Sequence, residues 1–222
     1  MAPSLFSSKN KLDSPGPVEK LFTRDKINFR YHRTPIINVF SPDCGPSGQV
    51  GNLNSLVGAD TPAKLFPTLT WEFDEEKKDQ YVVERLKKIK EYLVVVEDLD
   101  AAKVGTLGSS PRAIGIFFVI PPHKTAISAS DIVKDKKGRF EWILVAERGL
   151  VGGFKYGDLD GKVWRTPKSG HRIHFQVIAL SRTVDSGSLS EHPTVGSFRG
   201  ETDGAVLGWG EWVGIYDEKE KQ

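Results

Sequence analysis

The sequence contains very little sulfur, with one cysteine and one methionine in 222 residues. The single cysteine, Cys44, cannot form a disulfide within the chain. It lies in a segment rich in glycine and proline, with no base beside it in sequence, so we predict a structural rather than a nucleophilic thiol. A chain without internal disulfides fits a reducing compartment, and we expect a cytoplasmic location.

Long apolar runs are also missing. The longest one, Ala113 to Ile120, is far shorter than the roughly 20 residues that a membrane-spanning helix needs. Residues 1–21 lack the uninterrupted apolar stretch of a secretion signal. We therefore expect no integral membrane association.

Neither sign of charge is in clear excess. The 31 basic and 29 acidic residues are interspersed and give a net charge of +2, so no large basic face is predicted to follow a phosphate backbone. Nucleic acid is therefore not an expected partner. The sequence also lacks a phosphate-binding loop, a dinucleotide-binding glycine motif, a G-x-S-x-G elbow and paired C-x-x-C motifs, and we predict no cofactor.

What the sequence does contain is strand pattern. Residues 67–73, PTLTWEF, alternate apolar and polar side chains, as in a half-buried strand. Residues 91–98 and 113–122 are continuous runs rich in β-branched and aromatic residues, which is typical of central strands covered on both faces. Further strand candidates, among them HRIHFQVIAL and GWGEWVGIY, are separated by turn residues with little helix between them. The pattern predicts a mainly β sandwich.

The chain is predicted to form a single domain over residues 18–222. Residues 1–17 are rich in serine, proline, lysine and glycine, and we expect a flexible tail there. Residues 74–90 form a highly charged segment with apolar side chains at helical spacing. We interpret that segment as a solvated surface insertion without an assigned function.

Three carboxylates, Glu97, Asp98 and Asp100, lie at the end of the apolar strand of residues 91–98 and need a physical explanation. In a strand, alternate side chains share a face, so Asp98 and Asp100 are expected to point the same way while Glu97 points the other way. Like charges so placed need a compensating donor, cation or water. A metal, basic side chains or backbone N–H groups could compensate them. The alternative is that these aspartates cap a turn and bind their own backbone.

The best second element for a site is SGHRIHFQVIAL, which places His171 and Arg172 after Gly170 at the start of an apolar strand. His171 and His174 suggest metal ligands at first sight. Residues three apart on a strand face opposite sides, however, so a metal site built on this pair is not expected. His174 is expected to be a packed or surface histidine.

Four segments, LVVVEDLDAAK, GIFFVIPPHKT, GGFKYG and GHRIHFQVIALS, resemble the phosphatidylethanolamine-binding protein (PEBP) family, also called the Raf kinase inhibitor protein family. The resemblance runs from about Ile36 to Tyr216, and VLGWGEWVG is similar to its filamentous-fungal branch. It implies a two-sheet β sandwich with few short helices and a small ligand pocket at one end. The family residues that line a cavity for phosphate-like or carboxylate-like anions correspond here to Asp98 and His171.

This chain departs from the family pattern at several positions. The D-P-D-A-P motif loses both prolines over residues 98–102, and the tyrosine of H-R-Y is Ile173. The histidine that normally opens the following strand corresponds to Ile114. A pocket with one imidazole fewer should favour a more apolar ligand. The residues predicted to bind the ligand are Asp98, Asp100, Ile114, Gly170, His171 and Ile173.

Two functions of different classes follow from this resemblance. The first is a binding module for a small anionic or amphipathic ligand, which could also dock a protein partner. The alternative is a biosynthetic enzyme of fungal secondary metabolism, a non-hydrolytic cyclase that couples polyketide anhydride monomers, as in maleidride formation. In that enzyme Asp98 and His171 would be the acid/base pair, and Arg172 could hold an anhydride or carboxylate oxygen. A purely inhibitory surface for a kinase or protease is a third possibility.

Overall fold

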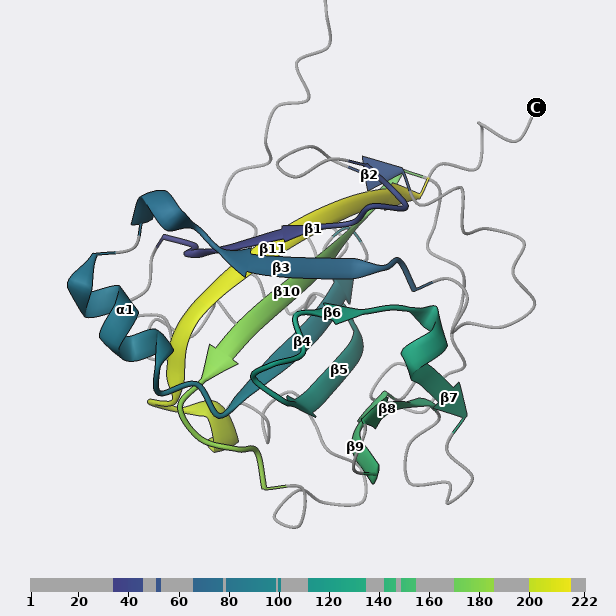
Figure 1. Ribbon diagram of the computed structural model, residues 1–222. Coiled ribbons are helices and arrows are strands. Elements are labelled where there is room, and N and C mark those ends of the chain that lie inside the picture. The colour runs from purple at the N-terminus through teal and green to yellow at the C-terminus, as the bar shows by residue number, and fades with distance from the viewer. Residues whose placement is uncertain are drawn as a thin grey trace, which may run out of the picture.

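Two sheets face each other in the computed structural model of the chain (Figure 1). The larger one has the strand order β2-β11-β10-β4-β5, where β2 is Gly51–Asn52, β11 Val206–Tyr216, β10 His171–Leu180, β4 Glu91–Asp98 and β5 Arg112–Ile120. The smaller one has the order β1-β3-β6, with β1 at Ile37–Phe40, β3 at Leu69–Phe73 and β6 at Ala126–Ile127. The structure describes residues 34–45, 51–52, 66–77, 79–98, 100, 112–134, 142–146, 149–154, 170–185 and 200–216.

The strand pairing follows the predicted apolar runs. Neighbouring strands are antiparallel except for the short parallel pairing of β2 with β11. A further three-stranded antiparallel sheet contains β7 (Ile132–Lys134), β8 (Trp142–Ala146) and β9 (Gly149–Phe154), and the 3-10 helix η4 (Ala129–Asp131) precedes it. The predicted mainly β, two-sheet sandwich with few short helices is confirmed, with this small third sheet as an addition.

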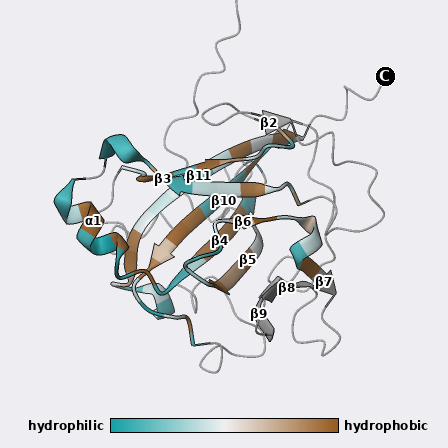
Figure 2. Ribbon diagram, viewed as in Figure 1, coloured by the Kyte–Doolittle hydropathy of each residue, from teal (hydrophilic) through white to brown (hydrophobic). Residues whose placement is uncertain are grey.

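Alternation along β4 divides the core into two apolar clusters. Tyr92, Val94 and Val96 point into the cluster between the two main sheets, and Leu93 and Val95 point into a second cluster on the other face. All eight residues of β4 are buried, as expected for a central strand covered on both sides. Figure 2 shows the hydrophobic colouring concentrated along the strands of the larger sheet.

Strand β1 crosses β11 at unusually close range. The Ile36 N–H donates to the Trp209 carbonyl at 3.0 Å. A Cβ added at Gly210 would lie 1.9 Å from the Ile37 carbonyl oxygen, and one at Gly208 would lie 2.5 Å from the Ile36 side chain. Glycine in β11 therefore permits the contact between the two sheets.

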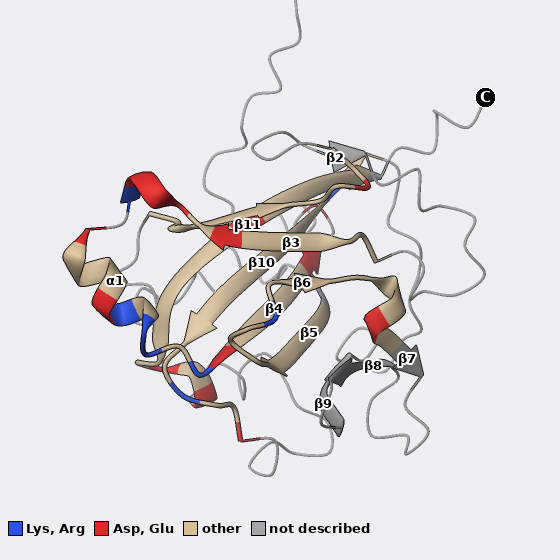
Figure 3. Cartoon of the chain, in the orientation of Figure 1, with Lys and Arg blue, Asp and Glu red and all other residues tan. Residues whose placement is uncertain are grey.

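The charged segment of residues 74–90 folds into the 3-10 helix η3 (Glu75–Lys77) and the helix α1 (Gln80–Leu86). Neither helix contains a buried residue, and Figure 3 shows how charges gather on them. The side chain of Asp79 caps α1 by accepting from the Val82 N–H at 2.7 Å. Arg85 ties α1 to the sheet by donating to the Leu207 carbonyl at 2.6 Å. The segment is thus fastened near the start of β11.

Two predictions concern the ends of the chain and its relation to membranes. The predicted tail, residues 1–17, lies outside the described residues. Among the ranges that the structure describes, no helix is long and apolar enough to cross a membrane.

Candidate functional site

Asp98 and His171 face each other at one end of the larger sheet. Strands β4 and β10 are antiparallel, and their register begins with Ile173 opposite Asp98, so the end of β4 lies beside the start of β10. The His171 Nδ1 lies 2.9 Å from Oδ2 and 3.1 Å from Oδ1 of Asp98. The Asp98 side chain is 8% exposed and the His171 side chain 18% exposed, so solvent reaches the imidazole more easily than the carboxylate.

Strand alternation explains why these two side chains meet. On β4, Val94 and Val96 point into the cluster between the sheets, and Asp98 is the next residue on that face. On β10, Ile173 and Phe175 point into the same cluster, and His171 precedes them on that face. The pair therefore closes the polar end of an apolar layer.

The geometry of the pair determines which imidazole nitrogen can do chemistry. An ionised carboxylate can only accept a hydrogen bond, so the His171 Nδ1 donates to Asp98. The other ring nitrogen, Nε2, then keeps its lone pair. An imidazole held in this tautomer can accept a proton at Nε2 while the carboxylate stabilises the resulting charge.

Arg172 and Asp100 form a second pair directly beside the first. The backbone N–H and the Nε of Arg172 both donate to Asp100 Oδ2 at 2.8 Å, and Nη2 donates to Oδ1. Burial raises the pKa of the Asp100 carboxyl, but the hydrogen bonds and charge of Arg172 outweigh this effect and hold the pKa below its usual value. The hydrogen bond from Arg172 to Asp100 likewise raises the pKa of the guanidinium.

The two aspartates thus have different partners. The expectation that Asp98 and Asp100 project together from one strand face does not describe the structure, because β4 ends at Asp98 and Asp100 lies in a turn. Asp98 has a hydrogen bond from His171, and the charge of Asp100 is compensated by Arg172. The compensating groups are basic side chains and one backbone N–H, which are two of the three classes that the sequence suggested.

The other residues predicted to bind a ligand, Gly170, Ile173 and Ile114, lie in three different environments. Gly170 immediately precedes His171 with φ +83°, a conformation that favours glycine, and it is exposed. Ile173 is only 3% exposed and packs into the core between the sheets. The backbone of Ile114 lies at the register shift between the pairs Val96–Gly115 and Glu97–Ala113, and its side chain lies outside the described residues.

The opposite face of the sheet carries a polar row that the sequence analysis missed. His174 Nδ1 lies 3.2 Å from Glu211 Oε2. Gln176 Nε2 lies 3.5 Å from both Glu97 Oε2 and Glu211 Oε2. The signal was present in the sequence, since positions 174 and 176 are polar alternate residues within an apolar strand. His174 therefore belongs to a different face from His171, and no group of three metal-ligating side chains occurs among the described residues.

Glu91 is a second group that the sequence analysis did not single out. It begins β4, at the end of the strand away from Asp98, and it is 0% exposed. Burial raises the pKa of its carboxyl to about 7, and the nearby backbone N–H groups of Val184 and Val119 offset only part of that effect. Val119 has φ +55°, so this carboxyl lies beside strained backbone.

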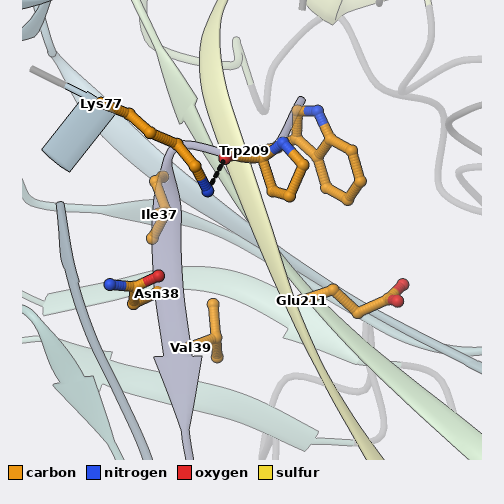
Figure 4. Close-up of a pocket in the computed structure, with 7 residues that line it drawn as sticks. Ile37, Asn38, Val39, Lys77, Trp209 and Glu211 are labelled. Carbon is orange, nitrogen blue, oxygen red and sulfur yellow. Dashed lines mark hydrogen bonds between the residues drawn. The ribbon is translucent and has the colours of Figure 1, made fainter. Parts of the chain in front are cut away.

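A groove of about 230 Å³ lies between β1 and β11 (Figure 4). Lys77 lines this groove, and its ammonium group already has two partners within the protein. Its Nζ donates to the Pro35 carbonyl at 3.1 Å and lies 2.7 Å from Asp74 Oδ2. The groove does not include Asp98 or His171, so it is separate from the site predicted by the motifs. The residues lining it are Pro35, Ile37, Asn38, Val39, Lys77, Trp209 and Glu211.

The fold is a mainly β sandwich, and the motifs that meet at the end of its larger sheet resemble those of the PEBP family. The chain is 30% identical over 200 residues to phomoidride biosynthesis cluster protein B of Talaromyces stipitatus, an alignment that covers 87% of this chain and 72% of that protein. It is 28% identical over 193 residues to the protein of the same name from another fungus, covering 85% and 82% of the two chains. The chain belongs to the family of these fungal proteins.

Two solved structures also align with the chain. One is a PEBP homologue from Chlamydia trachomatis, with a TM-score of 0.49, 14% identity and coverage of 83% of this chain and 99% of that chain. The other is Escherichia coli YbcL, described as a new member of the mammalian PEBP family, with a TM-score of 0.45, 18% identity and coverage of 82% and 98%. No family model matches the chain.

Proposed function

We propose that this protein is a non-hydrolytic coupling enzyme of fungal secondary metabolism, acting on anhydride-bearing polyketide monomers with His171 as its proton-transfer group. The names of the two relatives support a role in fungal secondary metabolism, since both proteins are named for a phomoidride biosynthesis cluster. The observation that carries the chemistry is the Asp98 carboxylate on Nδ1 of His171, which leaves Nε2 as the reactive nitrogen.

The proposed step moves one proton and forms one carbon–carbon bond. Nε2 of His171 removes a proton from a carbon beside an anhydride carbonyl, and the electron pair of the broken C–H bond remains as an enolate. The enolate carbon adds to a second monomer, and the imidazolium returns the proton to the adduct. Asp98 stabilises the imidazolium in between, at 2.9 Å from its Nδ1. Neither oxidation nor water is required, which suits a non-hydrolytic reaction.

The second candidate is a binding module that holds a small anionic or apolar-acid ligand without turnover. The same geometry supports it, because a protonated His171 whose Nδ1 is bound to Asp98 can donate only through Nε2. That single donor suits a phosphate-like or carboxylate-like oxygen. A protein partner docking beside the same site remains part of this second proposal.

The test is a coupling assay on the purified protein with anhydride-bearing polyketide monomers, with products followed by mass spectrometry. We expect His171→Ala and Asp98→Asn to lower the rate of coupling by about 10²–10⁴-fold, which is the usual contribution of a positioned acid/base group. The matched control is His174→Ala, which removes another imidazole that lies beside a carboxylate, on the opposite face of β10. Product formation that persists in His171→Ala would refute the mechanism. Saturable stabilisation by the monomers without any product would favour the binding module.

A further inference from the structure

We propose that Arg172 and Asp100 are positioning residues that hold His171 against Asp98, and that neither contacts the substrate. The catalytic meaning of this inference rests on the proposed function, whereas the positioning itself does not. It departs from the sequence prediction that Asp100 binds the ligand. For Arg172 it agrees with strand alternation, by which a side chain next to a pocket-facing residue points away from the pocket.

The first argument is where the two residues lie along the chain. Asp100 lies two residues after Asp98, and Arg172 lies one residue after His171. A bond between Asp100 and Arg172 therefore joins the two backbone segments immediately beside the Asp98–His171 pair. Any backbone movement that separates the start of β10 from the end of β4 must stretch that bond as well.

The second argument is that strand pairing holds the start of β10 on one side only. His171 and Arg172 pair with Tyr216 and Ile215 of β11. The register between β10 and β4 begins at Ile173 opposite Asp98, so His171 and Arg172 extend beyond the paired part of β4. The Arg172 N–H, which has no β4 carbonyl to accept it there, donates to Asp100 Oδ2 at 2.8 Å. A carboxylate thus takes the place of the missing strand partner.

The third argument is that the guanidinium is already occupied. Nε and Nη2 of Arg172 bind the two oxygens of one carboxylate in the bidentate geometry that makes arginine pairs specific. The lowered pKa of Asp100 keeps this carboxylate ionised at neutral pH, so the pair persists under working conditions. Substrate could recruit the guanidinium only by breaking a bidentate pair.

The first test measures the tautomer of His171 without any substrate, because the tautomer depends on whether the imidazole stays against Asp98. Nitrogen-15 NMR of the imidazole reports which ring nitrogen carries the proton, and the wild type should show the Nδ1–H tautomer. Arg172→Lys keeps the charge and the backbone N–H but loses the guanidinium that binds both oxygens of Asp100. Asp100→Asn removes the charge of the acceptor. We expect each to lower the ratio of Nδ1–H to Nε2–H tautomers about tenfold, because a displaced imidazole loses its charge-assisted hydrogen bond to Asp98.

The matched control for this test is a second ion pair of similar exposure. Lys124 Nζ lies 2.7 Å from Asp131 Oδ1, with the two side chains 28% and 25% exposed, compared with 21% and 25% for Arg172 and Asp100. Lys124→Gln should leave the His171 tautomer as in the wild type. An unchanged tautomer in both Arg172→Lys and Asp100→Asn would overturn the positioning role.

The second test separates positioning from substrate binding. In the coupling assay a positioning role predicts that Arg172→Lys lowers kcat at least tenfold with little change in KM, because the substrate is not contacted. A higher KM with unchanged kcat would instead assign Arg172 to the substrate and overturn the inference. If His171→Ala retains full activity, the proposed function fails, but the NMR result on His171 still decides whether Arg172 and Asp100 hold it in place.

Discussion

Both carboxylate oxygens of Asp98 lie within hydrogen-bond distance of Nδ1 of His171, at 2.9 and 3.1 Å. The two residues meet where β4 ends and its antiparallel neighbour β10 begins. The two residues are 73 positions apart in sequence, so the sheet alone brings them together. Because one ring nitrogen is bound in this way, the two side chains should act as a unit rather than independently.

The first prediction concerns the coupling between Asp98 and His171. If the pair acts as a unit, the double variant Asp98→Asn/His171→Ala should lose no more activity than His171→Ala alone, within about threefold. The physical reason is that Asp98 has no catalytic role once the imidazole is gone. The measurement is kcat/KM for the four proteins of this cycle. Multiplicative losses would show that the residues contribute separately.

The second prediction concerns Glu91 and pH. Its pKa is raised to about 7 in the folded protein from an ordinary value of 4.5, so the unfolded chain ionises first and burial opposes folding as pH rises. Stability linked to this group is therefore fully present below about pH 4.5 and is lost as pH rises to about 7. The total loss is on the order of 3 kcal/mol, because one pKa unit corresponds to about 1.4 kcal/mol.

The experiment is urea unfolding of the wild type and Glu91→Gln between pH 5 and 8. The difference in unfolding free energy between the two proteins should shift in favour of Glu91→Gln as pH rises, and comparing them removes the contribution of the other titrating groups. Glu72→Gln is the control, since Glu72 is exposed on β3. A wild-type to Glu91→Gln difference that is constant over this range would contradict the prediction.

The fold was predictable from sequence because its signal is local and repeated. Alternating side chains at 67–73 and the continuous apolar run at 91–98 gave strands that the structure has at Leu69–Phe73 and Glu91–Asp98. The meeting of Asp98 and His171 was predictable only through the family motifs, since no local pattern links residues so far apart.

The partners of Arg172 and Asp100 could not be predicted from alternation. Asp100 lies in a turn, where the two-residue period of a strand no longer applies, and its carboxylate binds the backbone as well as the side chain of Arg172. The buried position of Glu91 was also hidden, because a charged residue at the edge of an apolar run normally marks the end of the strand.

The third prediction concerns the crossing of β1 and β11. Gly210→Ala should destabilise the protein by at least about 2 kcal/mol, because the added Cβ would lie 1.9 Å from the Ile37 carbonyl oxygen and backbone cannot yield as a side chain can. Gly200→Ala is the control, since no atom lies within 4 Å of its added Cβ. Chemical denaturation of the three proteins gives the comparison. Equal stability of Gly210→Ala and the wild type would show that the strands separate there easily.

The fourth prediction concerns the ligand preference that the sequence motifs suggest. The resemblance to the PEBP family implies that Ile114 replaces a histidine of the family's pocket, so we expect phosphate and phosphoethanolamine to stabilise the wild type little and Ile114→His more. A ligand at 100 times its dissociation constant adds about 2.7 kcal/mol, and each kcal/mol moves the melting temperature of a chain of this size by roughly 2–4 °C. Thermal unfolding with phosphate, phosphoethanolamine and apolar dicarboxylic acids is therefore sensitive enough.

The control for this fourth prediction is Ile114→His combined with His171→Ala. If the restored imidazole completes an anion site with His171, the combined variant should lose the stabilisation by phosphate that Ile114→His gains. Stabilisation of the wild type by phosphate itself would show that the anion site survives without that imidazole, and the binding module would then become the better proposal. Stabilisation of the wild type by apolar acids alone is the result that the coupling enzyme predicts, because such acids share the charge and apolar body of its monomers.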